Sequence, residues 1–257
     1  MPHANLGDVQ IYYEEAGSGP AFVFCHGLGG NSSHFSTEDM AFWAQHFRVV
    51  AWDNRGLGQS SGAAKYSAPL YAEDLNRLME HLGIEKALIH GVSWGGVLVQ
   101  QFVLDYPERC LGIVLDSTSS EVNVASSEGW YARGERAKRG EDGIKPEHID
   151  STVAQSRAVA GLREHPYTPR LRNVTVPALA VGGGQDGTAG AGGTVILGRV
   201  LPNGRSHVFQ DAGHGIYRLK REEFRTMVLE FAREIGVIEP ALTPDPSPVG
   251  TGEGSQA

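Results

Sequence analysis

The sequence has few of the features that nucleic-acid-binding, secreted or membrane-spanning proteins need. Its 257 residues hold 22 Lys and Arg against 30 Asp and Glu, a formal net charge of −8. Nucleic-acid affinity rests on clustered Lys and Arg, so no nucleic-acid partner is expected. There is no charged start followed by an apolar stretch, and no run of about 18 apolar residues that could span a bilayer. We therefore expect a cytoplasmic protein with no membrane partner.

Cysteine is scarce as well. Cys25 and Cys110 are the only two, and they lie far apart without metal-ligand spacing. Two such thiols are expected to be reduced and buried as small core residues. The sequence also has no phosphate-binding glycine loop and no His/Cys cluster, so it implies neither a cofactor nor a metal ion.

What the sequence does contain is a G-x-S-x-G motif at residues 91–95, directly after the apolar run 87–89. Apolar residues at helical spacing follow, and Pro107 ends that helix because proline disfavours helix in the residue before it. A serine in a sharp strand-to-helix turn has its hydroxyl lifted clear of the sheet, and flanking glycines avoid a clash with neighbouring backbone. This context predicts that Ser93 is a nucleophile.

The first half of the chain predicts a sheet buried on both sides. The strands 21–25 and, after Arg48, 48–52 are continuous apolar runs, as in parallel sheets covered by helices. The first leads into the glycine-rich turn 26–30. Glycines in that turn free backbone amides to face an anion. The alternating segment 9–13 instead predicts antiparallel edge strands.

The second half supplies two more polar residues after strands. The strand 175–181 is followed by Asp186, and the strand 206–209 by His214, which lies between two glycines. Ser, then Asp, then His is the order along the chain that one family of hydrolases uses.

With these motifs the chain resembles the α/β-hydrolase superfamily over roughly residues 8–236. The resemblance rests on four motifs in the family's order, at residues 26–29, 53–60, 91–95 and 213–214. It implies an α/β fold with a mostly parallel sheet, helices on both faces and a small helical cap. It leans toward serine-nucleophile members, enol-lactonase-like and esterase-like, because dehalogenases and most epoxide hydrolases of this family have aspartate in place of Ser93.

The resemblance also implies a catalytic site. Ser93 is then the nucleophile, His214 the base, and Asp186 the acid that fixes the imidazole tautomer. The backbone amides of Leu28 and Trp94 would hold the oxyanion.

Other polar residues near these motifs receive structural interpretations. Asp116, at the end of the strand 111–115, is the second candidate for the acid, but we expect it to cap the entrance to the lid. The loop with Asp53 and Arg55 is expected to hold the floor of the site together, as it does in the family. His90 and His207 are expected to pack or to form hydrogen bonds.

The chain divides into three parts. Residues 1–116 and 174–239 are expected to form the hydrolase core, and 117–173 a helical cap inserted at the carboxyl ends of the strands, where such folds bind ligands. Helical spacing around residues 149–160 supports the cap. The segment 240–257 holds four prolines with Gly, Ser and Thr, which predicts a disordered tail.

The expected cap contains an aromatic and basic cluster with two open interpretations. Trp130 and Tyr131, with Arg133 and Arg136, could line a substrate pocket with a carboxylate clamp, since arginine binds carboxylates in a bidentate manner. A solvated helix with two inner aromatics explains the same residues and is favoured.

Several functions remain open on this fold. The first is hydrolysis of a small-molecule carboxylic ester or lactone, with short acyl chains preferred over long ones. The second is cleavage of a carbon–carbon bond in ring-cleavage products, or cofactor-free perhydrolysis, with the same three residue types. The third is a ligand-binding module without activity. The acyl group, the leaving group and the oligomeric state are left open.

Overall fold

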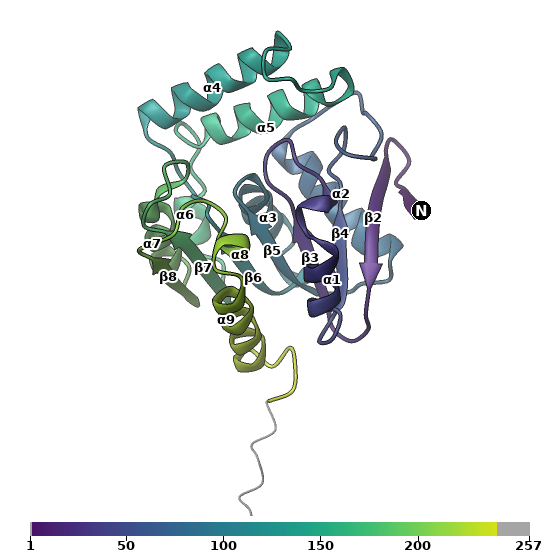
Figure 1. The fold of residues 1–257 in the computed structure, drawn as a ribbon, viewed down its shortest axis with the longest axis vertical. Coiled ribbons are helices and arrows are strands. Elements are labelled where there is room, and N and C mark those ends of the chain that lie inside the picture. The colour runs from purple at the N-terminus through teal and green to yellow at the C-terminus, as the bar shows by residue number, and fades with distance from the viewer. Residues whose placement is uncertain (1, 241–257) are drawn as a thin grey trace, which may run out of the picture.

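An eight-stranded sheet forms the centre of the structure, a computed structural model that describes residues 2–240. The strands are β1 (His3–Asn5), β2 (Gln10–Ala16), β3 (Ala21–Cys25), β4 (Arg48–Trp52), β5 (Ala87–Val92), β6 (Cys110–Asp116), β7 (Ala178–Gly183) and β8 (Gly204–Phe209). Their order in the sheet is β1-β2-β4-β3-β5-β6-β7-β8 (Figure 1). β2 pairs antiparallel with both β1 and β4, and all other pairs are parallel. The predicted fold class and the antiparallel N-terminal edge are confirmed.

The central strands are apolar throughout because both faces of the sheet are covered. In β3 every residue is buried, and alternate side chains point to opposite faces. Val23 packs into one core, whereas Phe22 and Phe24 pack into the other. A strand with one solvated face would need polar residues at every second position, and β3 has none.

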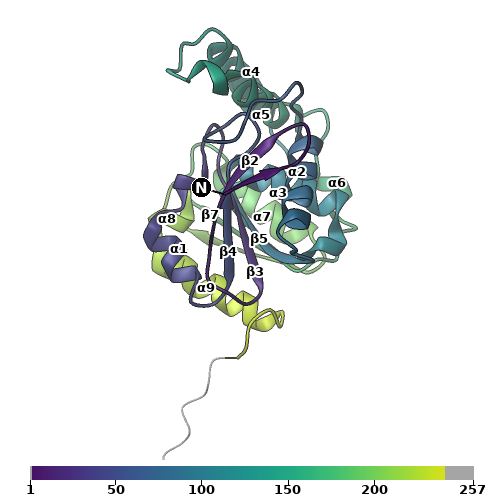
Figure 2. The ribbon, with the colours of Figure 1, turned by 90° about the vertical axis from the view of Figure 1, so that its right-hand side faces the viewer.

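Helices cover both faces of this sheet. The helices are α1 (Thr37–Trp43), α2 (Ala68–His81), α3 (Trp94–Asp105), α4 (Val124–Lys138), α5 (Ile149–Gly161), α6 (Thr168–Leu171), α7 (Gly190–Val200), α8 (Ile216–Leu219) and α9 (Arg221–Glu234), with short 3₁₀ segments at Ser32–His34, Pro107–Arg109 and Pro146–His148. α2, α3 and α7 pack on one face of the sheet, and α1, α8 and α9 on the other (Figure 2). No helix within residues 2–240 is long and apolar enough to cross a membrane.

α4 and α5 stand apart from these two layers. They pack against each other between β6 and β7 in the chain, at one end of the sheet (Figure 1). Asn123 caps α4 by accepting a hydrogen bond from the Ser126 amide at 2.8 Å, and a 3₁₀ turn beginning at Pro146 leads into α5. The helices therefore occupy the segment expected to be the cap. The division into core 1–116 and 174–239 and cap 117–173 stays a prediction.

Two expected boundaries differ from the observed ones. β7 begins at Ala178 rather than at Thr175, because Pro177 has no N–H to donate to a ladder; its carbonyl still accepts from the Ile113 amide. β8 begins two residues before the expected Ser206, at Gly204. Apart from its first residue, the tail expected at 240–257 lies outside the described residues.

Candidate active site

Ser93 lies in a strained turn between β5 and α3. Its backbone φ is 57° and ψ is −116°, and only one other non-glycine residue in the described part of the chain, Ser117, has a positive φ. A Cβ on Gly91 would overlap the carbonyl oxygen of Gly95, and a Cβ on Gly95 would overlap that of Cys25 in β3. Both glycines of the motif are therefore required by close backbone contacts, and the turn holds Ser93 at the end of the sheet.

His214 and Asp186 meet across the loops that follow β8 and β7. His214 Nδ1 lies 2.9 Å from Asp186 Oδ2. The other oxygen, Oδ1, accepts hydrogen bonds from the amides of Thr188 at 2.7 Å and Ala189 at 3.0 Å. Burial favours a raised pKa of the Asp186 carboxyl, but the hydrogen bonds from His214 and the two amides outweigh it, so the pKa is lowered. The carboxylate both faces the imidazole and holds its own glycine-rich loop.

We expected Asp116 to cap the entrance to the lid, and this expectation was wrong. The carboxylate is fully buried, and it accepts backbone hydrogen bonds from Ile216 and Tyr217, both at 2.9 Å. Ser117 adds to this anchor, since its hydroxyl donates to Asp116 Oδ1 and accepts from the Gly215 amide, both at 2.8 Å. Asp116 therefore holds the chain just after His214, and the imidazole ring has Asp186 as its carboxylate partner.

Leu28 and Trp94, whose amides are expected to hold the oxyanion, both lie at the cavity that contains Ser93. Both residues border the same cavity as Ser93, and neither amide donates a hydrogen bond within residues 2–240. The neighbouring amide of Gly29 instead donates to the side chain of Gln155 at 2.9 Å. Two amides without a partner in the described chain, on residues that share a cavity with a serine, are available to bind an oxyanion.

Gln155 was not singled out from the sequence, although it connects α5 to the Leu28 turn. Its amide nitrogen donates to Asn54 Oδ1 at 3.1 Å, and the same oxygen accepts from the Trp94 indole at 3.1 Å. The side chain of Asn54 thus links the loop after β4 to α3 and α5. Its place in the polar turn 53–60 was the one available signal, whereas nothing in the sequence around Gln155 marks it.

Asp53 and Arg55 make structural contacts, in agreement with their interpretation from the sequence. Asp53 accepts from the amides of Ser32 at 2.6 Å and Gln59 at 2.7 Å. Arg55 forms a buried bidentate pair with Asp74 of α2, at 2.5 and 2.6 Å. These bonds fix the floor of the site to the helix layer.

The other histidines near the motifs are poor candidates for a base. Burial lowers the pKa of His26 to about 4, and its Nε2 accepts from the Asn54 amide at 3.1 Å. His90 is buried among aromatic rings that include Phe24. His207 on β8 is exposed and packs edge-on against Phe209. His90 and His207 are thus packing residues, and His26 is neutral at pH 7.

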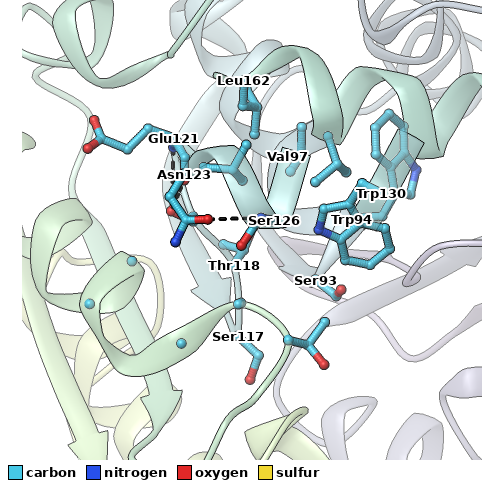
Figure 3. Close-up of a pocket in the computed structure, with 18 of the residues that line it drawn as sticks. Ser93, Trp94, Val97, Ser117, Thr118, Glu121, Asn123, Ser126, Trp130 and Leu162 are labelled. Atoms are coloured by element: carbon cyan, nitrogen blue, oxygen red, sulfur yellow. Dashed lines mark hydrogen bonds between the residues drawn. The ribbon is translucent and has the colours of Figure 1, made fainter. Parts of the chain in front are cut away.

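Two cavities of about 380 Å³ each meet at Ser93. The Thr118 cavity extends toward Thr118, Glu121 and Leu162, and Figure 3 shows Trp94 and Trp130 close to its serine end. The His214 cavity is bordered by His214, His34, Arg133, Arg218 and Leu219. Leu28, Trp130 and Thr188 border both. A substrate with two halves therefore has a separate space on each side of the serine.

The aromatic and basic cluster of α4 divides between these cavities and the solvent. Trp130 and Arg133 line the site, as the pocket interpretation required. Tyr131 is 54% exposed, so the expectation of two inner aromatics was wrong for this residue. Arg136 points away and pairs with Asp142 at 3.2 Å. Helix geometry explains why Trp130 and Arg133, three residues apart, share the face toward the site while Tyr131, next to Trp130, does not. Arg136 is drawn instead toward Asp142 in the loop after α4.

Both cysteines are buried, as expected. Burial raises the pKa of the Cys25 thiol to about 12 and raises that of Cys110 as well. Neither residue borders the two cavities at Ser93.

Known proteins are similar to this chain in sequence and in structure. A family model described as alpha/beta hydrolase fold matches residues 20–146. The 3-oxoadipate enol-lactonase 2 of Acinetobacter baylyi is 26% identical over 210 residues, 70% of this chain and 77% of that protein. The 2-hydroxy-6-oxo-6-phenylhexa-2,4-dienoate hydrolase of Comamonas testosteroni is 24% identical over 274 residues, 90% of this chain and 93% of that protein. A thermophilic esterase from Thermogutta terrifontis has a TM-score of 0.79 at 22% identity, with 90% of this chain and 96% of that one covered.

The chain has the α/β-hydrolase fold, and these similarities support its assignment to the α/β-hydrolase superfamily. This assignment supports a hydrolytic enzyme.

Proposed function

We propose that this protein is a serine hydrolase that cleaves a carboxylic ester or a lactone through an acyl-serine intermediate. The observation that carries the proposal is the pairing of His214 with Asp186 at 2.9 Å, with His214 bordering the same cavity as the strained Ser93. A buried carboxylate that accepts from Nδ1–H leaves the other ring nitrogen, Nε2, unprotonated and able to act as a base. No metal or cofactor is needed for this chemistry.

The proposed reaction has two steps. In the first, His214 takes the proton of the Ser93 hydroxyl as the oxygen attacks the carbonyl carbon, and the amides of Leu28 and Trp94 bind the developing oxyanion. The carbon–oxygen bond to the leaving group then breaks, and His214 gives its proton to the leaving oxygen. In the second, a water molecule attacks the acyl-serine with the same base, which releases the acid and restores Ser93.

The amides of Leu28 and Trp94 would contribute to the rate by stabilising the negative charge that develops on the carbonyl oxygen. Removing one such donor costs on the order of 10²–10³ in rate in a serine protease. Leu28 and Trp94 would act here through backbone N–H groups, so their side chains are free to shape the site. Gln155 supports the same turn through the Gly29 amide.

The test is a screen of the purified protein with p-nitrophenyl esters of graded length, a set of lactones and a ring-cleavage dienoate. We expect turnover of esters or lactones and, on rapid acid quenching, an acyl adduct on the peptide that contains Ser93. Turnover of the dienoate alone would move the function to carbon–carbon bond cleavage. Binding of these compounds without turnover or adduct would leave a ligand-binding module and overturn the proposal.

A further inference from the structure

The two cavities at Ser93 differ in the sign of the charged side chains that border them. Glu121 is the one charged side chain that borders the Thr118 cavity within the described residues. The His214 cavity holds two arginines, Arg133 and Arg218, and no Asp or Glu of the described chain borders it. In a protein with a formal net charge of −8, this is a local reversal of sign beside the proposed nucleophile.

Both guanidinium groups lack a carboxylate partner. Within residues 2–240 neither Arg133 nor Arg218 forms a salt bridge, whereas Arg136, on the same helix as Arg133, pairs with Asp142. The Nε atom of Arg133 is buried without a hydrogen-bond acceptor, and its guanidinium carbon lies 5.6 Å from the centre of the Trp130 ring. A cation that is partly withdrawn from water and has no carboxylate partner is stabilised by an anion that can accept its hydrogen bonds.

Arg218 borders the same cavity as Arg133, and its charge acts on a third residue there. The pKa of His34, which also borders this cavity, is lowered by burial and further by the charge of Arg218. Arg133 lies on α4 and Arg218 on α8, so the two guanidinium groups approach the cavity from separate elements. An anion in this cavity therefore has guanidinium groups from two elements at its border.

The position of His214 indicates which half of a substrate lies in the His214 cavity. His214 borders the cavity with the arginines and not the Thr118 cavity. In the proposed reaction it donates its proton to the oxygen of the leaving group as the carbon–oxygen bond breaks. The leaving group therefore occupies the His214 cavity and the acyl group the Thr118 cavity.

The Thr118 cavity suits an uncharged acyl group with a polar end. The Thr118 hydroxyl is buried without a hydrogen-bond partner, and its residue is only 2% exposed. Glu121 would repel a carboxylate in this space, since like charges at close range disfavour binding. The apolar residues Val97 and Leu162 supply the rest of the wall.

On the basis of the proposed hydrolase function, we infer that the leaving group of the substrate carries a carboxylate, bound between Arg133 and Arg218, and that the acyl group is uncharged. The step balances without a further reactant. The Ser93 oxygen forms a bond to the carbonyl carbon, the bond to the leaving oxygen breaks, and the serine proton passes through His214 to that oxygen. The carboxylate itself takes no part in the bond changes.

The experiment compares two pairs of matched esters. 4-(Butanoyloxy)benzoate and 4-(butanoyloxy)benzamide share the acyl group and differ in the charge of the leaving group. Phenyl hydrogen succinate and phenyl butanoate share the leaving group and differ in the charge of the acyl group. We expect kcat/KM to be at least about tenfold higher for the benzoate than for the benzamide, and lower for the succinate than for the butanoate.

Variants assign the preference to the two arginines. Arg133→Gln and Arg218→Gln should each reduce the benzoate-to-benzamide ratio by about tenfold, and Arg136→Gln should leave it within twofold. The ratio also corrects for any loss of folded protein, because both esters are measured on the same sample. A wild-type ratio near one, or a ratio that survives in both arginine variants, would overturn the inference.

A binding measurement separates this inference from the proposed function. Calorimetry with Ser93→Ala compares 4-hydroxybenzoate with 4-hydroxybenzamide as leaving-group analogues. Tighter binding of the benzoate that is lost when Arg133→Gln is added supports the anion site, even where no ester is hydrolysed and the hydrolase proposal itself fails. Equal binding of the two compounds contradicts the anion site, even where ester turnover supports the hydrolase.

Discussion

Ile216 donates its backbone N–H to the buried carboxylate of Asp116 at 2.9 Å, two residues after His214 in the chain. Asp186 instead contacts the ring of His214. β6 and β7 are neighbours in the sheet, so both carboxylates arise at adjacent strand ends, yet they hold different parts of one loop. Asp116 fixes where the backbone of the loop lies, and Asp186 fixes how the imidazole is turned.

This division predicts different effects for the two Asp→Asn changes. Asp186→Asn keeps the shape of the side chain but leaves the imidazole in the wrong tautomer, a loss of about 10⁴ in kcat in the serine-protease precedent. We expect a loss of at least about a hundredfold here, with little change in the midpoint of urea unfolding.

Asp116→Asn should have the opposite profile. Its carboxylate accepts three hydrogen bonds, and an amide nitrogen in place of one oxygen leaves a buried N–H without an acceptor. That costs about 1–3 kcal/mol of unfolding free energy, whereas kcat in the folded fraction should change by less than about tenfold. Steady-state kinetics and urea titrations on both variants check this ranking. A larger loss of kcat in Asp116→Asn than in Asp186→Asn would move the acid to Asp116.

Ser93→Ala should abolish hydrolysis and leave the fold intact. Loss of the nucleophile of a comparable triad costs about 10⁶ in turnover, with a residual rate from the oxyanion site. The left-handed backbone of residue 93 is held by its neighbours, so alanine should keep the turn. Turnover of the best ester and a circular dichroism melt measure the two effects. A variant that kept a tenth of wild-type activity, free of contaminating esterase, would show that Ser93 is not the nucleophile.

The placement of Ser93, Asp186 and His214 at one edge of the sheet was predictable because each lies within a few residues of the end of a strand. Parallel strands end at the same edge of the sheet, so residues distant in sequence meet there without knowledge of the loops. Position in the sheet could not show which of Asp116 and Asp186 contacts the imidazole and which holds the backbone. Asp116 ends β6 and Asp186 lies just after β7, and only the observed structure shows which of the two carboxylates contacts the imidazole.

Contacts made by the segment between β6 and β7 were the least predictable. Helical spacing in 149–160 indicated an apolar face, but it does not specify what a polar side chain on that helix meets. Gln155 reaches the Gly29 amide only because of how α5 lies over the sheet. Tyr131 and Trp130 are adjacent in sequence and equally aromatic, yet one is exposed and the other lines the site.

Substrate length should be limited by the space around Ser93. The Thr118 cavity measures about 380 Å³ and is bounded by Trp130, Leu162 and the polar end near Glu121. We therefore expect acetate and butyrate esters, or compact lactones, to have a higher kcat/KM than long-chain esters. A series of p-nitrophenyl esters from two to sixteen carbons tests this, with detergent-free controls for the long chains. A maximum at twelve or more carbons would contradict it.

The two cysteines should resist alkylation in the folded protein. Thiolate is the reactive form, and a pKa of about 12 leaves only about one Cys25 in 10⁴ ionised at pH 8. We expect no mass increase after an hour with iodoacetamide at pH 8, and two adducts when guanidinium is present. Ala64→Cys, at an exposed position, is the positive control and should gain one adduct in the native state. Native labelling of Cys25 at the rate of residue 64 would contradict its burial.

The buried pair of Arg55 and Asp74 should contribute more to stability than the more exposed pair of Arg77 and Asp8. Asp74→Ala leaves the guanidinium of Arg55, which is 1% exposed, with only the exposed carboxylate of Asp8 at 3.3 Å, and breaking such a buried pair costs about 3–5 kcal/mol. Arg77→Ala removes a pair with Asp8, whose side chain is 54% exposed, and should cost less than about 1 kcal/mol. Urea titrations compare the two variants with the wild type. The loss of stability in Asp74→Ala comes from the buried charge of Arg55 that remains. The double change Arg55→Met with Asp74→Leu removes that charge and should recover most of the lost stability. A double variant as unstable as Asp74→Ala would contradict this explanation.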